Sequence, residues 1–241
     1  MANSPLAQFE IKRLVPMEVA GYDVSFTNSS LWMVLVVLTV TLFMNLGMRR
    51  AALVPGRWQS MVEMLYEFVA NMLQETAGNE GRKYFPFIFT LFIFILCANL
   101  LGLIPYSFTV TSHIIVTFAL AAVVFLVVTA VGFIKHGLHF LKFFVPSGVP
   151  FIMLPLLVVI EVISYLTRPI SLSVRLFANM MAGHTMLKVF GGFAVALGAL
   201  GILPILFIVA ITGLELLVAL LQAYVFAVLT CIYLNDALHM H

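Results

Sequence analysis

The chain has 241 residues, of which 63% are hydrophobic and only 9% are charged, and its formal net charge is +2. This composition excludes an ordinary soluble globular domain, and so small a net charge gives no reason to expect a nucleic-acid partner. Several uncharged runs are long enough to cross about 30 Å of hydrocarbon as helices. The short alternating segments of a membrane β-barrel are absent. We therefore predict an all-α polytopic membrane protein.

Residues 1–30 are predicted to form an extramembrane tail. They are mixed and polar, and they lack the apolar centre of a cleavable signal peptide. The first predicted span follows at residues 31–48. It is closed by two basic residues and a turn, Arg49, Arg50 and the pair Pro55-Gly56.

The segment 57–78 differs from a membrane span. Its apolar residues recur at helical spacing, while polar side chains occupy other positions, namely Glu63, Glu67, Asn71 and Gln74. This pattern predicts a helix that lies along the membrane surface. A helix packed on another subunit would have the same pattern, so both interpretations stay open.

Two uncharged spans are predicted at residues 85–104 and 114–134, joined by the short polar connection 105–113. Basic residues predict their orientation. Positions 49, 50, 57, 82 and 83 carry Lys or Arg on one side of the predicted membrane, whereas 105–113 on the other side contains neither. Because basic residues accumulate on the cytoplasmic side, five crossings predict a cytoplasmic C-terminus and an N-terminal tail outside.

The last two apolar stretches, 149–190 and 202–235, are unusually long. As continuous helices they would extend about 60 Å and about 50 Å, well beyond the thickness of a bilayer. We predict a steeply inclined helical hairpin that turns within 191–204. Alternatively, each stretch breaks into shorter elements at a proline, at Pro155, Pro169 or Pro204.

One arginine lies deep in the stretch 149–190. Arg175 cannot lose its proton at accessible pH, and a charge at membrane depth is costly without a partner. Four further polar residues fall within about 40° of the same helical line. They are Glu161, Arg168, Ser171 and Asn179. The only acid among them, Glu161, is about 21 Å from Arg175 along the axis, so the sequence favours a carboxylate from another chain. Glu215 is the alternative partner within this chain.

A second polar line runs along the stretch 202–235. It contains Glu215, Gln222 and Tyr233. His184 lies on the helix face opposite Arg175, about 13 Å further along the axis, and Glu215 is its candidate partner.

Several of these residues also have structural interpretations. Asn179 and Gln222 can join membrane helices by hydrogen bonds. Arg168 and Lys188 lie nearer helix ends, where long basic side chains extend to headgroups.

Three motifs, in the same order, resemble the a subunit family of F-type ATP synthases. The most specific is SLSVRLFANMMAGH at 171–184, and the others are NLLGLIPY at 99–106 and ELLVALLQAYVFAVLT at 215–230. The resemblance covers essentially the whole chain. It implies one transmembrane helix, a surface helix, a transmembrane pair and a long tilted hairpin that faces a ring of partner helices.

The resemblance also implies roles for single residues. Arg175 matches the essential arginine for proton translocation. The half-channel from the outer side is assigned to Asn179, His184, Glu215 and Gln222, and Glu161 matches an acidic position near the cytoplasmic exit. The partners implied are the c-ring subunits with a carboxylate opposite Arg175, b-type stalk subunits, other ATP synthase subunits and membrane lipid.

The resulting functional prediction is proton translocation through two half-channels in a bacterial inner membrane, coupled to rotation of the ring. We expect a non-catalytic subunit without a cofactor, because no phosphate-binding loop occurs and Cys97 and Cys231 form no metal pattern. Three alternatives remain. A secondary transporter would be expected to contain internal repeats, which we do not find. In an assembly subunit the polar lines would only join helices, and a sodium-driven variant would depend on the ring.

Overall fold

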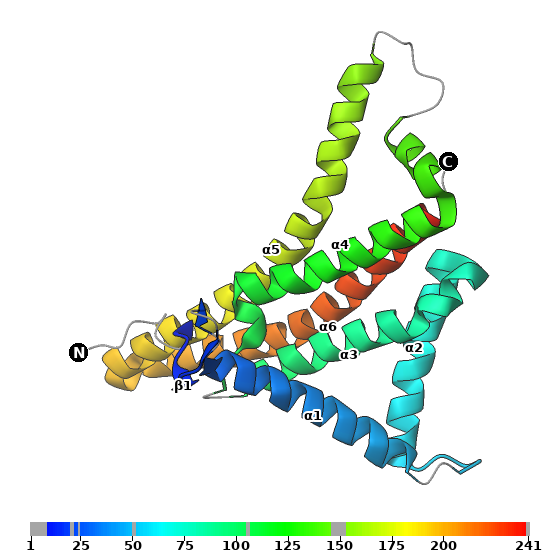
Figure 1. Cartoon of the computed structure of the whole chain (residues 1–241). Coiled ribbons are helices and arrows are strands. Elements are labelled where there is room, and N and C mark those ends of the chain that lie inside the picture. Colours follow the sequence, from blue (N-terminus) through cyan, green and yellow to red (C-terminus); the bar gives the residue numbers. More distant parts are fainter. Residues whose placement is uncertain are drawn as a thin grey trace.

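The computed structural model describes residues 9–19, 22–23, 25–49, 52–104, 107–145 and 153–239. Val149, where the fourth long stretch is expected to begin, lies outside these residues, as do Arg50, Pro105 and Tyr106. Helices dominate the described chain, and five of them are long and apolar enough to cross a membrane. This agrees with the predicted all-α polytopic class (Figure 1).

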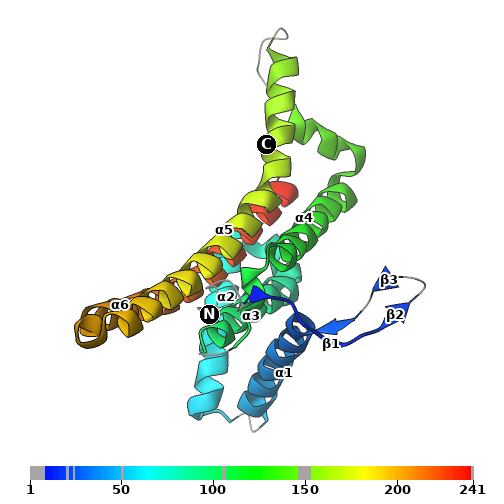
Figure 2. The same ribbon diagram turned by 90° about the vertical axis from the view of Figure 1, so that its left-hand side faces the viewer.

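The N-terminal tail contains four short strands, which the sequence did not predict. Strand β1 (Arg13–Val15) pairs with β4 (Phe26–Thr27), and β2 (Glu18–Val19) pairs with β3 (Tyr22–Asp23), both antiparallel. Figure 2 shows β1 near the beginning of helix α1, whereas β2 and β3 extend away from the helices. The tail therefore meets the helical body through the β1–β4 pair.

Helix α1 (Asn28–Met48) begins where the Thr27 hydroxyl accepts a hydrogen bond from the Ser30 amide at 3.3 Å. Helix α2 (Arg57–Gly81) follows, inclined to α1 and to α3 (Phe85–Gly102) in Figure 1.

Part of the apolar face of α2 is covered by its own chain, while Trp58, Met61 and Met64 remain exposed. Val69 and Leu73 are buried in the core. The ring of Phe68 lies 5.8 Å from that of Phe92 on α3 and 5.7 Å from that of Tyr224 near the C-terminus. The position of α2 at a membrane surface stays a prediction.

Helix α4 (Ile114–His136) follows the one-turn helix η3 (Val110–Ser112), and the short helix η4 (Gly137–Phe144) continues it. The last two helices are α5 (Leu154–Ala196) and α6 (Ile202–Leu238). They lie side by side over much of their length in both ribbon views (Figures 1 and 2).

Helix α5 runs without interruption through Pro169, so the stretch does not break there. Its 43 residues extend about 65 Å. The chain reverses at the short helix η5 (Gly198–Gly201), where Gly198 has φ +53°. This left-handed conformation is accessible to glycine without strain.

Polar side chains fix the hairpin against its neighbours. Ser173 on α5 shares a hydrogen bond with Thr117 on α4 at 3.1 Å. The Asn99 amide of α3 donates to the Ala219 carbonyl of α6 at 3.3 Å, and Asn99 Oδ1 accepts from the Thr111 hydroxyl at 2.8 Å. In apolar surroundings such bonds set the position of one helix along another.

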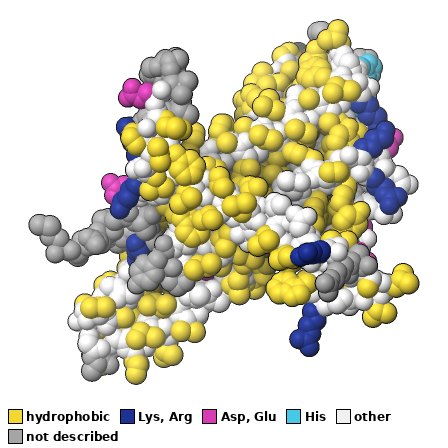
Figure 3. Space-filling model, turned by 60° about the horizontal axis from the view of Figure 1, so that its bottom comes forward, with side chains coloured by type: hydrophobic (Ala, Val, Ile, Leu, Met, Phe, Trp, Pro, Cys, Tyr) yellow, Lys and Arg dark blue, Asp and Glu magenta, His cyan; other side chains and the backbone are white. Residues whose placement is uncertain are grey.

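The molecular surface is strongly apolar. Figure 3 shows hydrophobic side chains over the middle of one face, with charged side chains gathered toward its two sides. Large apolar residues on α5, including Ile170 and Val174, are exposed. This distribution suits a protein whose surroundings are lipid and other membrane helices.

Candidate functional site

The sequence-predicted residues His184 and Glu215 come together between α5 and α6. His184 Nδ1 lies 3.1 Å from Glu215 Oε1, and both side chains are buried, with exposed fractions of 9% and 4%. Among the described residues no group donates a hydrogen bond to either carboxylate oxygen. Since a buried carboxylate without a donor is costly, the pair has the properties of a site that holds and exchanges a proton.

A loop from the α3–α4 connection completes this pair. The Gly102 carbonyl at the end of α3 accepts hydrogen bonds from the hydroxyls of Ser107 at 2.9 Å and Thr109 at 3.2 Å. Thr109 Oγ1 also lies 2.7 Å from His184 Nε2. The loop thus holds Thr109 against the histidine from the side opposite Glu215.

This geometry favours one histidine tautomer. A threonine hydroxyl has one proton, and while Thr109 gives it to the Gly102 carbonyl, Thr109 can only accept from His184 Nε2. Nε2 then carries hydrogen, and Nδ1 faces Glu215. In that tautomer Nδ1 and the carboxylate are both acceptors, 3.1 Å apart, and their repulsion is relieved when either group binds one proton.

The pair is reached through a cavity of about 690 Å³. Its wall includes the N-terminal tail, the start of α1, residues 102–104 and 107–109, and residues of α5 and α6. Its ionisable lining residues are Glu10, Lys12, His184, Lys188 and Glu215. The first two are exposed and the pair His184–Glu215 is buried. The cavity therefore leads from the tail to the buried pair, and its volume is ample for a chain of water molecules.

Arg175 lies on a different face of α5. Its side chain is exposed, next to exposed Val174, and within the described residues no carboxylate pairs with it. Glu215, the alternative internal partner, pairs with His184. The guanidinium is thus available to a group outside this chain.

The other predicted site residues are less buried than the pair. Asn179 is exposed, one helical turn beyond Arg175. Glu161 and Gln222 are half-buried on α5 and α6. The structure does not bring Glu161 or Asn179 to the His184–Glu215 pair.

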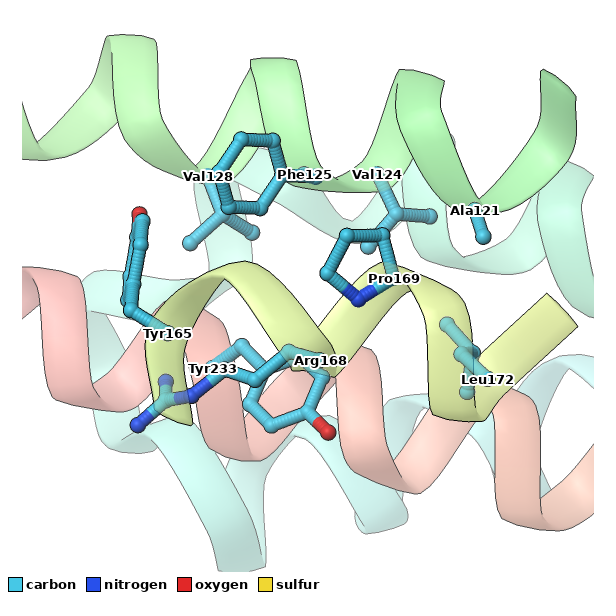
Figure 4. A pocket seen from close by; sticks show the side chains of 9 residues that line it. All are labelled: Ala121, Val124, Phe125, Val128, Tyr165, Arg168, Pro169, Leu172 and Tyr233. Carbon is cyan, nitrogen blue, oxygen red and sulfur yellow. The ribbon is translucent and has the colours of Figure 1, made fainter. Parts of the chain in front are cut away.

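Arg168, which one interpretation places near headgroups, turns toward α6. Its Nη1 atom lies 3.1 Å from Asp236 Oδ2, and its guanidinium carbon lies 4.8 Å from the ring centre of Tyr233 and 5.3 Å from that of Tyr165. Figure 4 shows this arginine beside the Tyr233 ring, in a small space between α4, α5 and α6. The predicted polar line is therefore divided, with Arg168 paired internally and Arg175 exposed.

Known proteins match the chain along its whole length. Residues 30–235 match the family model described as ATP synthase A chain. The chain is 60% identical over 243 residues to ATP synthase subunit a of Pelagibacter ubique, with 100% of both proteins covered. It is 61% identical to ATP synthase subunit a of Parvibaculum lavamentivorans, with 98% of this chain and 93% of the relative covered. For ATP synthase subunit a of a Chelativorans species the identity is 62%, and 99% of both is covered.

The chain belongs to the ATP synthase A chain family. The resemblance found in the sequence is thereby confirmed. Members of this family are membrane subunits of the F-type ATP synthase and not its catalytic subunits, so the expectation of a non-catalytic subunit is confirmed as well. The five apolar helices agree with that membership.

Sequence reasoning missed several residues around the site. Thr109 lies in the polar connection 105–113, but its contact with His184 depends on how the loop folds back on Gly102. Glu10 and Lys12 belong to the predicted polar tail, for which the sequence indicates no role at the site. His113, at the end of the same connection, stacks on Phe108 with ring centres 4.9 Å apart, and burial lowers the pKa of its side chain.

Proposed function

We propose that this chain translocates protons across a bacterial inner membrane through two offset half-channels, and so couples proton flow to the rotation of a c ring. One observation carries the proposal: α5 has an exchangeable acid–base pair at the end of a cavity on one face and a fixed cation on an exposed face. A path that ends at exchangeable groups, on the same helix as a permanent charge, is the arrangement that stepwise transfer to a moving carboxylate requires.

The outer half-channel is the cavity that ends at His184 and Glu215. Histidine and glutamate both exchange protons in an accessible pH range. A proton that arrives through the cavity moves to the position between Nδ1 and the carboxylate, and from there to the ring. Gln222, two helical turns beyond Glu215 on α6, supplies a polar group along that last step.

Arg175 is the fixed charge. It cannot act as a relay because it does not release its proton. It attracts the ionised carboxylate of a ring subunit and favours proton loss from it. It also keeps the two water paths electrostatically separate, since a proton is repelled from the space beside a guanidinium.

The inner half-channel leads away from the ring near Glu161. Asn179 and Arg175 flank the transfer region on the same exposed part of α5. The N-terminal tail is on the outer side and the C-terminus is cytoplasmic, in agreement with the positions of the basic residues. Moving one charge through 100 mV releases about 2.3 kcal/mol, which is available to drive each step of the ring.

The partners are the c-ring subunits on the exposed face of α5, b-type stalk subunits elsewhere, and membrane lipid. The exposed apolar residues of α5 suit a moving neighbour, because they offer no hydrogen bonds that would hold it in one position.

Arg175→Lys tests the proposal. Lysine keeps the charge but lacks the planar fork and can lose its proton when buried. In inverted membrane vesicles that contain the assembled complex, we expect this variant to lose most ATP-driven proton pumping while the complex still assembles. Pumping near the wild-type rate would overturn the proposal.

A further inference from the structure

The wall of the outer cavity includes a part of the chain outside the helical bundle. Phe9, Glu10 and Lys12 of the N-terminal tail line it, together with Asn28 and Trp32 at the beginning of α1. The tail is separated in sequence from the buried end of the cavity by most of the chain. The proton path proposed above assigns no role to these residues of the tail.

Asn28 fastens the tail at this position. Its amide nitrogen Nδ2 donates to the Glu10 carbonyl, and its Oδ1 accepts from the Lys12 backbone amide, both at 3.1 Å. The Asn28 backbone amide donates to the Lys12 carbonyl, also at 3.1 Å. Three bonds from one residue hold positions 10 and 12 against the first turn of α1, and so keep both residues at the cavity.

Glu10 is the exposed acid of this cavity. Lys12 and Lys188 also line it, and lysine keeps its proton near neutral pH. Its other ionisable lining groups, His184 and Glu215, are buried. Within the described chain no hydrogen bond or ion pair is formed by the Glu10 carboxylate. Glu10 is therefore the lining group that can take a proton directly from outer water and release it into the cavity.

The supply of protons makes such a group useful. With an encounter rate constant on the order of 10¹⁰ M⁻¹s⁻¹, the upper end of the diffusion limit, a single buried site receives on the order of 10² protons per second at an outer pH of about 8. Turnover of enzymes commonly falls within about 1–10³ per second. At alkaline outer pH, proton arrival therefore limits transport, and an acceptor at the mouth of a cavity increases the rate of capture. Lys12 and Lys188 in the same wall repel approaching cations, so a carboxylate beside them contributes more to the rate at which protons are captured.

We propose that Glu10, held by Asn28 at the mouth of the outer cavity, is the proton-collecting carboxylate that supplies His184 and Glu215 when protons outside are scarce. The inference rests on the proposed function, because it assumes that this cavity conducts protons from the outer side. Glu10 gains a proton from water and passes it along water in the cavity, so its own charge is restored after each transfer.

The test uses the complete ATP synthase in proteoliposomes, with synthesis driven by an imposed membrane potential and the pH on the tail side varied. For Glu10→Gln we expect the wild-type rate at a pH of about 6 and a rate about 3–10-fold lower at a pH of about 8.5, where arrival is limiting. Glu10→Asp keeps a carboxylate and restores most of the rate. Glu18→Gln removes the same charge from the same tail at a residue that does not line the cavity, and it leaves the profile unchanged.

Two outcomes would overturn the inference. The first is a rate for Glu10→Gln that equals the wild-type rate at every pH. The second is a rate that falls by the same factor at every pH, as a structural defect would cause. Arg175→Lys is measured in parallel. Normal ATP synthesis by Arg175→Lys would contradict the proposed function itself. If Arg175→Lys loses synthesis while Glu10→Gln keeps the wild-type pH profile, only the role of Glu10 is contradicted.

Asn28→Ala gives an independent measurement. It removes two of the three bonds that hold the tail and leaves every ionisable group in place. We expect it to reproduce part of the alkaline loss, by about 2–3-fold, with no change at acidic pH. An unchanged profile would show that the tail needs no fastening at this cavity and would contradict the role given to Asn28.

Discussion

The two faces of α5 differ in what their polar groups can do. On the buried face, His184 contacts Glu215 and Thr109 beside a cavity. On an exposed face, Arg175 has no carboxylate partner within the described part of the chain. One face offers groups that gain and lose a proton, and the other offers a charge that never changes.

The comparison teaches that, under the proposed function, the residues that conduct protons need not be the residue whose charge separates the two half-channels. A conducting path needs exchangeable groups and water. A barrier needs a permanent charge in a medium where that charge acts over distance. A single helix can present both because nine residues bring the chain to its opposite face.

The strongest test compares one substitution on each face. Glu215→Ala removes the exchangeable acid, and we expect passive proton conductance of membranes stripped of the catalytic sector to fall by about 10²-fold. Arg175→Ala removes the fixed charge, and we expect conductance to rise, because under the proposed function nothing then separates the two half-channels. The measurement is the decay of an imposed pH gradient. Changes of the same sign in both variants would contradict the division between the faces.

A smaller effect is expected from Gly183→Ala, because the two helices approach closely there. A Cβ atom at this position would lie 2.9 Å from Cδ of Glu215, so the carboxylate must move. Overpacking of this kind costs about 1–3 kcal/mol, and we expect ATP-driven pumping to fall about 5–100-fold. Gly191→Ala on the same helix is the matched control, since a Cβ there meets nothing within 4 Å. Equal effects in the two variants would exclude this steric explanation.

Thr109→Val tests whether Nε2 of His184 carries the hydrogen. Valine keeps the shape but removes the acceptor for His184 Nε2, which lies 2.7 Å away. The lost hydrogen bond is worth about 0.5–1.5 kcal/mol, so pumping should fall about 2–10-fold. Thr109→Ser restores the hydroxyl and should recover most of the rate. Failure of serine to do so would mean that the methyl group, and not the hydrogen bond, matters.

The smallest effect is expected at the pair Arg168–Asp236, about two helical turns from Arg175. Both side chains are partly exposed, at 20% and 35%, so their coupling is about 0.5–1 kcal/mol. Arg168→Gln, Asp236→Asn and the double variant should lower the temperature of aggregation in detergent by a few degrees, with less than additive effects in the double variant. Additive effects would show that the two residues act independently.

The sequence predicted the opposed faces of α5 because helical periodicity alone determines them. The 3.6-residue repeat sets His184 and Arg175 on opposite sides whatever the surroundings are. The pairing of His184 with Glu215 was also predicted, because few exchangeable groups occur in the two long stretches. These inferences needed no knowledge of the loops.

Contacts that depend on loops and on helix register could not be derived in this way. Thr109 reaches His184 across 75 positions of sequence, through a turn that no periodic pattern describes. Arg168 meets Asp236 because of the way α5 and α6 are aligned, 68 positions apart in the chain. The contribution of Glu10 to the cavity requires the Asn28 bonds, which hydropathy does not reveal.

The uninterrupted course of α5 through Arg175 and His184 has a mechanical consequence. No hinge separates the two residues, so they cannot adjust independently, and a twist of the helix about its long axis moves them in opposite senses. If a passing rotor draws the arginine sideways, the same torsion shifts the imidazole relative to its acid. Under the proposed function, one rigid helix can thereby couple the binding of a proton at His184 and Glu215 to the passage of the carboxylate that receives it.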